Sequence, residues 1–178
     1  MTSRSRTAAL KLQSAVPSAR RTIERISTER QLLQLFGSGL KSDDLKEVLD
    51  TYEIQPVLAG KAVITEGTTG DDIYVIRQGS MVVERKVNGK PVFLSYLPAG
   101  SYIGEMALIG GTRRSATVRA AIKSEVIKLE GYSFKNLMQK KPELLAKLKK
   151  DMAGRQDVNA FIEAKKDSFS GIVDMYSN

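Results

Sequence analysis

The sequence contains neither cysteine nor histidine in its 178 residues. The absence of cysteine excludes disulfide bonds and thiol nucleophiles, and the absence of both residues excludes zinc sites of the usual Cys/His kind. Without histidine, every mechanism that uses imidazole as the general acid or base is excluded as well. A hydrolytic site would need a Ser/Lys pair or paired carboxylates, and no spacing in the chain singles one out. We therefore expect a binding protein and not an enzyme.

Long apolar runs are also missing. Stretches such as Met106–Ile109 are far shorter than the ~20 residues that span a bilayer, and the N-terminus has charges but no apolar core of a signal peptide. We expect a soluble, cytoplasmic protein with no transmembrane segment. The first 22 residues are rich in arginine and serine and lack acids, which is also typical of an organelle transit peptide. A disordered or docking tail explains them equally well.

The charge of the chain is strongly positive, with a net charge of +8 and a pI near 9.7. A basic protein favours anionic partners such as nucleic acid, acidic lipid or a phosphate-bearing ligand. Basic residues gather in the acid-free first 23 residues and again as lysines between residues 135 and 150. Solvated surfaces are the ordinary explanation for such charge runs.

Helical spacing marks both ends of the chain, and a period of two marks its middle. From residue 54 to residue 129, short β-branched or aromatic stretches alternate with glycine-containing turns, a pattern typical of a β-sandwich or barrel. Asn88-Gly89 is a strong hairpin signal, because both residues tolerate positive φ. Pro17 is expected to interrupt the first helical pattern, and Pro142 to begin the last helix. We expect an N-terminal extension over 1–31, one domain over 32–166 and a tail over 167–178.

The segment from Gly104 to Val118 carries the pattern with chemical meaning. Gly104 allows a close turn, and the residues from Glu105 to Ile109 can form one helical turn whose free N–H groups attract an anion. Arg114 follows at a distance that lets it fold back and donate paired hydrogen bonds to phosphate oxygens. Glu105, an acid beside an anion site, would accept a hydrogen bond from a neutral hydroxyl such as that of a ribose. An ordinary turn with a surface salt bridge between Glu105 and Arg114 is the alternative.

The sequence resembles the cyclic-nucleotide-binding domains, the family of kinase regulatory subunits, the bacterial catabolite activator protein and nucleotide-gated channels. The resemblance covers residues 32–161 and rests on five motifs in order: Leu35-Phe36, residues 60–67 (GKAVITEG), 70–79 (GDDIYVIRQG), 104–109 (GEMALI) and 113–118 (RRSATV). It implies an α+β fold, an eight-stranded antiparallel β-roll of the jelly-roll-like barrel type. N-terminal helices, a short phosphate-cassette helix and C-terminal lid helices would complete this fold.

The resemblance also implies roles for individual residues. Glu105 would bind the ribose 2′-hydroxyl, and Arg114 the equatorial oxygen of the cyclic phosphate. The remaining cradle, base-contact and lid positions are Gly104, the N–H groups of Met106, Ala107 and Ala116, the Ser115 hydroxyl, the apolar Ile103, Leu97 and Val83, and Asn159 in the last helix. Plain core packing explains the three apolar residues equally well, and a solvent-facing position explains Asn159. Arg113 stands where kinase subunits often have proline, and we expect it to face solvent.

The ligand implied is cAMP or cGMP, with no other cofactor. Ser115 does not decide between them, because a hydroxyl residue occurs here in members of both selectivities; we favour cAMP. Occupancy would be transmitted through the C-terminal helix to a partner or fused effector, and this helix could also pair two copies in a homodimer. The alternatives are a degenerate domain that acts as a protein-interaction scaffold, and the sensor fragment of a transcription regulator. Nothing after Ala164 is long enough for a helix-turn-helix, and a cupin-type enzyme would need histidines.

Overall fold

Two four-stranded antiparallel sheets form the centre of the protein. The computed structural model describes residues 3–37 and 39–164, with side chains described for 17–37 and 39–156. One sheet has the order β1-β8-β3-β6 and the other β2-β7-β4-β5. The strands are β1 (Glu53–Val57), β2 (Ala62–Ile64), β3 (Ile73–Gln78), β4 (Ser80–Val87), β5 (Lys90–Pro98), β6 (Tyr102–Ile103), β7 (Thr117–Ala120) and β8 (Ser124–Leu129). The predicted antiparallel roll is confirmed, but it is not a closed barrel, because the strands pair within two separate sheets.

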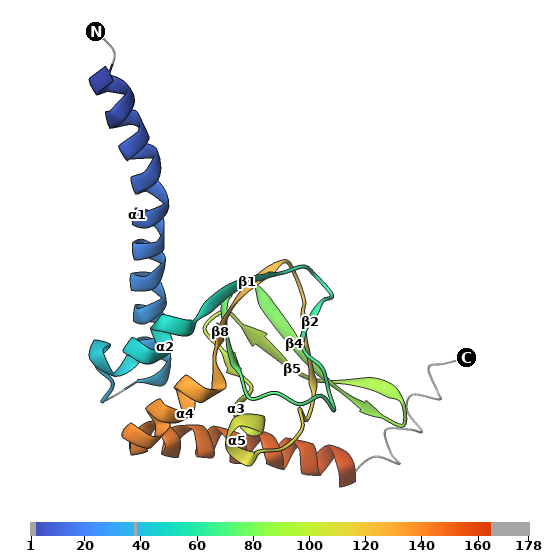
Figure 1. Ribbon diagram of the computed structural model, residues 1–178. Helices are drawn as coiled ribbons and strands as arrows, with labels where there is room; N and C mark the ends of the chain where they lie inside the picture. The colour runs from blue at the N-terminus through green and yellow to red at the C-terminus, as the bar shows by residue number, and fades with distance from the viewer. Residues whose placement is uncertain (1–2, 38, 165–178) are drawn as a thin grey trace.

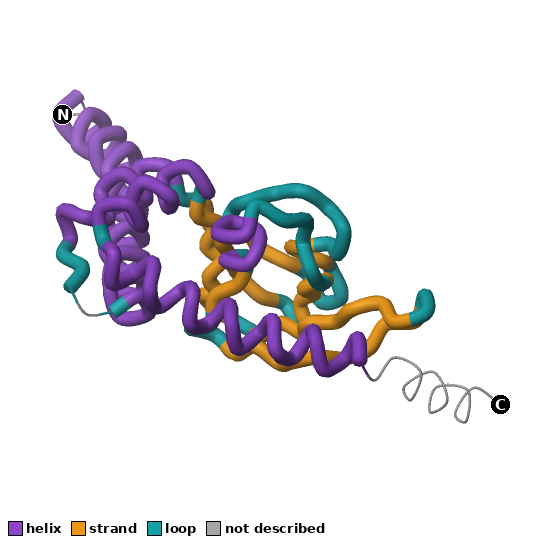
Figure 2. The backbone as a smooth tube through the Cα atoms, turned by 90° about the horizontal axis from the view of Figure 1, so that it is seen from below, coloured by secondary structure: helices purple, strands orange, loops and turns teal. Residues whose placement is uncertain are grey.

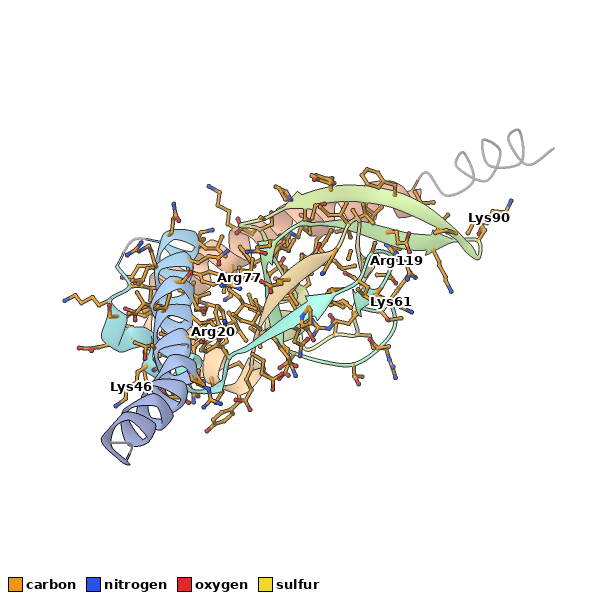
Figure 3. The ribbon with its side chains drawn as sticks, turned by 90° about the horizontal axis from the view of Figure 1, so that it is seen from above. Arg20, Lys46, Lys61, Arg77, Lys90 and Arg119 are labelled. Carbon is orange, nitrogen blue, oxygen red and sulfur yellow. The ribbon has the colours of Figure 1, made fainter. Side chains whose placement is uncertain are left out.

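The sharp turns of this roll follow from local chemistry. At the β4–β5 connection Asn88 has φ 51° and Gly89 φ 78°, the left-handed conformations that a tight hairpin requires. The hairpin projects from the roll and carries Lys90 near its tip (Figure 3). The predicted Asn-Gly hairpin is therefore confirmed.

Alternation along the strands separates two apolar cores. Ile73 and Val75 of β3 belong to the core beneath the helices, and Ile76 belongs to the core between the sheets. Since successive side chains of a strand point to opposite faces, one strand serves both cores. The core between the sheets is small, and it borders the cavity described below.

Helices gather at one end of the roll. They are α1 (Ser3–Phe36), the 3₁₀ helix η1 (Ser42–Leu45), α2 (Lys46–Thr51), α4 (Gly131–Lys140) and α5 (Pro142–Ala164), while α3 (Glu105–Gly110) lies between β6 and β7. Phe36 of α1 packs against Phe134 of α4 and Tyr102 of β6 with ring centroids 5.2 Å apart in both pairs. From this end α5 runs along the strands (Figure 2) and contacts α3. The predicted helix start at Pro142 is confirmed.

The N-terminal helix is longer than the sequence suggested. Pro17 was expected to interrupt it, but α1 continues through Pro17 as one helix. Proline removes a single i→i−4 hydrogen bond and can kink a helix without ending it, and the turns on both sides retain their own bonds. The N-terminal part of α1 stands away from the roll (Figure 1). The expected division at residue 31 falls inside this helix and stays a prediction.

Three lysines of the lysine-rich segment near the C-terminus pair with acids of other elements. Lys135 contacts Asp71 at 3.0 Å, and Lys141 contacts Asp44 at 3.0 Å. Such partly exposed pairs contribute little stability each, but they agree with a solvated surface. Among the described residues, no helix is both long enough and apolar enough to cross a membrane.

Candidate functional site

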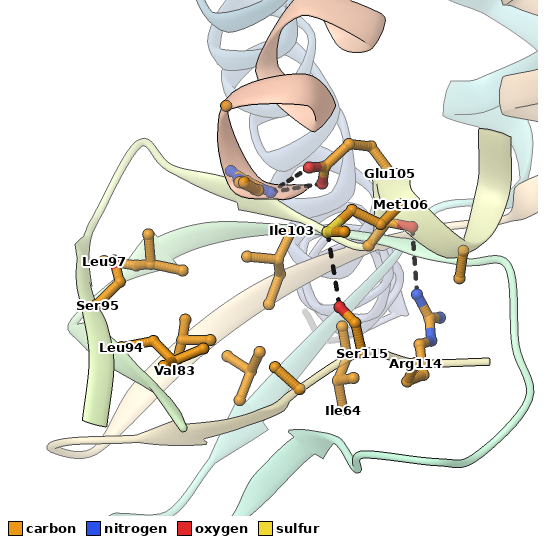
Figure 4. Close-up of a pocket in the computed structure, with 16 residues that line it drawn as sticks. Ile64, Val83, Leu94, Ser95, Leu97, Ile103, Glu105, Met106, Arg114 and Ser115 are labelled. Atoms are coloured by element: carbon orange, nitrogen blue, oxygen red, sulfur yellow. Dashed lines mark hydrogen bonds and ion pairs between the residues drawn. The ribbon is translucent and has the colours of Figure 1, made fainter. Parts of the chain in front are cut away.

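A cavity of about 330 Å³ opens between the two sheets, with α3 and α5 at its rim. This volume lies at the lower end of the range for small-molecule sites. Its walls are Ile64, Val83, Leu94, Ser95, Leu97, Ile103, Gly104, Glu105, Met106, Ala107, Arg114, Ser115, Ala116, Val118, Gly154 and Arg155 (Figure 4). All of the site residues predicted from the sequence line this cavity except Asn159. Asn159 belongs to α5, but its side chain lies outside the described residues.

A left-handed glycine sets the start of α3. Gly104 has φ 107°, and a Cβ atom there would lie 2.6 Å from the carbonyl oxygen of Asp72. Only glycine fits this backbone position without displacing its neighbours. The turn brings Glu105 directly into the cavity wall, where its side chain is fully buried.

Arg114 lies on the other side of this turn and is buried, with 7% of its surface exposed. Its Nη1 donates to the carbonyl oxygen of Gly104 at 3.3 Å, and its Nη2 donates to that of Asp72 at 3.0 Å. These bonds fix the guanidinium plane beside the cavity. Among the described residues, no carboxylate forms an ion pair with Arg114. A buried cation held only by neutral carbonyls is suited to receive an anionic ligand, because burial is costly for a charge without a counterion.

Glu105 pairs with an arginine that the sequence analysis did not select. Arg155 of α5 contacts both carboxylate oxygens of Glu105 at 2.5 Å and donates to the carbonyl oxygen of Tyr102 at 2.9 Å. The surface salt bridge considered between Glu105 and Arg114 is therefore wrong: both side chains are buried and each has other partners. The sequence spacing does place Arg155 on the apolar face of α5, because Leu148, Met152 and Arg155 follow each other at intervals of four and three residues.

Burial raises the pKa of Glu105, and the nearby Arg155 charge opposes this rise. A carboxyl group without water is harder to ionise, and the guanidinium supplies the opposite charge that stabilises the ionised form. Glu105 can accept hydrogen bonds from a ligand hydroxyl only while it keeps a lone pair free of Arg155.

A second set of contacts attaches α5 beside the cavity. The Tyr102 hydroxyl donates to Asp151, and Lys147 contacts the same carboxylate at 3.3 Å. Arg155 also lies over the Tyr102 ring, 5.4 Å from its centroid. Burial and the hydrogen bond to Asp151 raise the pKa of Tyr102 above its usual range, so the hydroxyl stays a donor. These contacts fix the α5 turn that carries Arg155.

The remaining wall is mostly apolar. Val83 of β4 and Leu97 of β5 face the cavity opposite Ile103, and the cavity also touches their core neighbours Ile64 and Val118. Ser115 lies across from α3, with its Oγ 3.6 Å from the Met106 sulfur. One half of the cavity can thus hold a flat apolar group, and the other half offers a guanidinium, a carboxylate and a hydroxyl. Among the described residues no acidic cluster could hold a metal ion.

Comparisons with known proteins agree with this geometry. The family model described as "Cyclic nucleotide-binding domain" matches residues 54–141. The chain is 38% identical over 128 residues to the cAMP-activated global transcriptional regulator CRP of Salmonella typhimurium, which covers 71% of this chain and 61% of that protein. It is 37% identical over 101 residues to the cAMP-dependent protein kinase regulatory subunit of Yarrowia lipolytica, which covers 57% of this chain and 26% of that protein.

The fold of the chain is also similar to that of a solved structure. The regulatory domain of Toxoplasma gondii PKA with cAMP superimposes with a TM-score of 0.64 at 27% identity, over 75% of this chain and 51% of that one. The chain thus spans less than two thirds of the length of these relatives.

Proposed function

The chain belongs to the cyclic nucleotide-binding domain family through residues 54–141, and we propose that it binds a cyclic nucleotide monophosphate in the cavity beside Arg114, with cAMP preferred over cGMP. The observation that carries the proposal is the buried Arg114 guanidinium, which neutral carbonyls hold at the cavity wall without a carboxylate among the described residues. A cyclic phosphate has one negative charge and exocyclic oxygens that an arginine can bind.

The phosphate would lie between Arg114 and the first turn of α3. The first N–H groups of a helix have no acceptor within the helix, so the N–H groups of Met106 and Ala107 can donate to phosphate oxygens. Ser115 and Ala116 line the same cavity, and in this proposal the Ser115 hydroxyl and the Ala116 N–H also donate to the phosphate. A single small anion would thereby neutralise the buried guanidinium.

The ribose would lie next to Glu105, whose carboxylate would accept a hydrogen bond from the 2′-hydroxyl. Arg155 contacts both oxygens of this carboxylate. Because each carboxylate oxygen has two lone pairs, Glu105 can hold Arg155 and the hydroxyl together. The ribose site would then include a residue of α5 as well as a residue of the cassette.

The base would extend between the sheets, among Val83, Leu97 and Ile103. We favour adenine because this wall is apolar, with Ser95 and Ser115 as its hydroxyl side chains. The names of the relatives also support this choice, since both the transcriptional regulator and the kinase subunit are described by cAMP. Asn159 stays a candidate for a base contact from α5.

Occupancy would be transmitted through α5 to a partner or a fused effector. Arg155 and Asp151 connect this helix to Glu105 and Tyr102 at the edge of the cavity. A ligand that binds differently to the attached and detached arrangements of α5 would shift the balance between them. In this proposal the protein is a cytoplasmic sensor without enzymatic activity, as its regulator relatives suggest.

Calorimetric titration of the full chain with cAMP and with cGMP tests this proposal. We expect saturable binding of both nucleotides at one site per chain, with tighter binding of cAMP. Absence of binding for both would refute the function and favour a non-binding scaffold. Tighter binding of cGMP would leave the site in place and refute only the choice of base.

A further inference from the structure

Helix α1 presents an apolar face on the side opposite its contact with the roll. Ile23 and Ile26 are 68% and 53% exposed, whereas Leu32 and Phe36 of the same helix are buried in the core. Ile23 and Leu32 are nine residues apart, which is two and a half turns at 3.6 residues per turn. Ile23 therefore points away from the roll, and Ile26, about one turn further along α1, is exposed beside it.

The sequence continues this face toward the N-terminus with a seven-residue period. Apolar residues recur at alternating spacings of three and four: Ala9, Leu12, Val16, Ala19, Ile23 and Ile26. The whole series lies within the continuous helix Ser3–Phe36. A repeat of this kind is the a/d pattern of a coiled coil, which requires a second helix along the same seam.

We propose that α1 is a dimerisation element, and that it pairs in parallel with α1 of a second copy of this chain. The a positions are Ala9, Val16 and Ile23, and two of these three are β-branched. β-branched residues at a favour two parallel strands over larger assemblies. Pro17 occupies a b position, where its ring faces away from the seam.

The charges beside the seam permit this parallel pairing. In a parallel pair each g position faces the next e position of the other helix. These pairs are Ala15 with Arg20 and Thr22 with Ser27. Neither pair opposes two like charges. Arg20, at an e position, lies on the surface of α1 (Figure 3). Arg21, at an f position, is exposed as well.

The character of the stripe also favours a helix over a lipid surface as the occupant. Helices that lie on membranes carry a wide apolar face with Trp, Phe or Leu. Here the stripe is narrow, and the one aromatic residue among residues 1–36 is Phe36, which is buried. From Ala9 to Ile26 the seam measures about 26 Å at 1.5 Å per residue. This is short for a coiled coil, so we expect a reversible dimer.

The arrangement in space leaves room for two copies. The N-terminal part of α1 stands clear of the roll (Figure 1). Two rolls would thus lie on the outer sides of the paired helices, with both nucleotide cavities accessible. This pairing uses α1, whereas the dimer expected from the sequence uses the C-terminal helix.

Sedimentation velocity of the full chain over a hundredfold concentration range tests the proposal. We expect a concentration-dependent shift from monomer to dimer, and monomer at all concentrations for the double variant Ile23→Asn, Ile26→Asn. The matched control Ser18→Asn, Arg21→Asn changes c and f positions of the same helix and should dimerise like the wild type. Both isoleucines are exposed, so the double variant should retain the thermal midpoint of the roll. A dimer that persists in the double variant would contradict the proposal and indicate another interface, such as α5.

A single introduced cysteine tests the parallel orientation, because the chain has no thiol of its own. In a parallel pair the two residues at position 26 face each other across the seam, whereas two residues at position 21 lie on the outer surfaces, too far apart for a disulfide. Ile26→Cys should form a covalent dimer under mild oxidation, and Arg21→Cys should not. Equal cross-linking of both variants, or of neither, would overturn the parallel pair. A wild type that stays monomeric but sediments with phosphatidylserine vesicles would show that the face binds lipid and that the proposal is wrong.

Discussion

Replacing Arg114 by alanine removes the one group that we expect to neutralise the ligand phosphate. The guanidinium is buried, and it is fixed by the carbonyl oxygens of Gly104 and Asp72 at 3.3 and 3.0 Å. In Arg114→Ala a bound cyclic phosphate would keep its charge in a poorly hydrated place without its counterion. Truncating one partner of a buried charge pair costs about 2–5 kcal/mol. At about 1.4 kcal/mol per tenfold change, the affinity should fall roughly 30-fold to several-thousand-fold.

Isothermal titration calorimetry with cAMP, cGMP and adenosine measures this loss. Adenosine has no phosphate, so its weaker affinity should not change in Arg114→Ala. The matched control is Arg113→Ala, because Arg113 is the neighbouring arginine, is exposed, and donates to the carbonyl oxygen of Gly67 at 2.9 Å. Its nucleotide affinity should stay within about twofold of the wild type, as is usual for exposed substitutions.

Loss of structure must be separated from loss of the contact, because Arg114 also connects two loops. Thermal unfolding of the Arg114→Ala protein should still be a single cooperative transition. Arg114→Lys, which retains a charge but not the paired donors, should have an intermediate affinity. If folded Arg114→Ala binds both nucleotides as tightly as the wild type, or if Arg113→Ala loses as much affinity, our assignment of the phosphate site is wrong.

Three further changes test the surroundings of this site. Glu105→Gln should weaken cAMP binding by roughly 10-fold to 150-fold, the range for a hydrogen bond to a charged group. The same variant should bind 2′-deoxy-cAMP, which lacks the hydroxyl, almost as tightly as the wild type does. An equal loss of affinity for both nucleotides in calorimetry would contradict the ribose contact. Arg155→Ala should lower the free energy of unfolding by about 1–2 kcal/mol, less than for a fully buried pair because its side chain is 36% exposed. Without Arg155, burial raises the pKa of Glu105 further, so the folded variant binds more protons than its unfolded state. The stability difference between the wild type and Arg155→Ala should therefore shrink as the pH falls from 8 to 5 in urea titrations. A stability difference that grows as the pH falls would refute the pairing. Gly104→Ala should lower the free energy of unfolding by roughly 1–3 kcal/mol, since φ at this position is 107° and the new Cβ would meet the Asp72 carbonyl oxygen. An unchanged melting temperature would count against a turn that requires glycine.

Local patterns predicted the elements of the fold well. The period of two between residues 54 and 129 identified the strands, the Asn88-Gly89 turn identified the hairpin, and Pro142 marked the start of α5. The exception was Pro17, which the helix accommodates. Proline weakens the helical turn in which it lies, and this much can be predicted from the sequence. Whether the helix continues depends also on the helical turns on both sides of Pro17, and α1 does continue.

Only part of the candidate site was predicted, because sequence patterns report on residues that lie close together in the chain. Glu105 and Arg114 lie within one short segment, and the resemblance to a family implied that both contact a ligand. Arg155 was missed because its partner is 50 residues away in the sequence. Nothing near Arg155 in the sequence shows that its guanidinium faces a buried carboxylate.

The sequence by itself determined where most strands, turns and helices occur, and which short segment contains the residues of the proposed phosphate and ribose site. These features depend on backbone preferences and on the alternation of apolar side chains within a few residues. Only the tertiary structure decided that β1 pairs with β8, that the roll stays open as two sheets, and that α5 brings Arg155 to Glu105. These contacts join residues about 50 or more positions apart, and their free energy depends on burial and charge that exist only once the chain has folded.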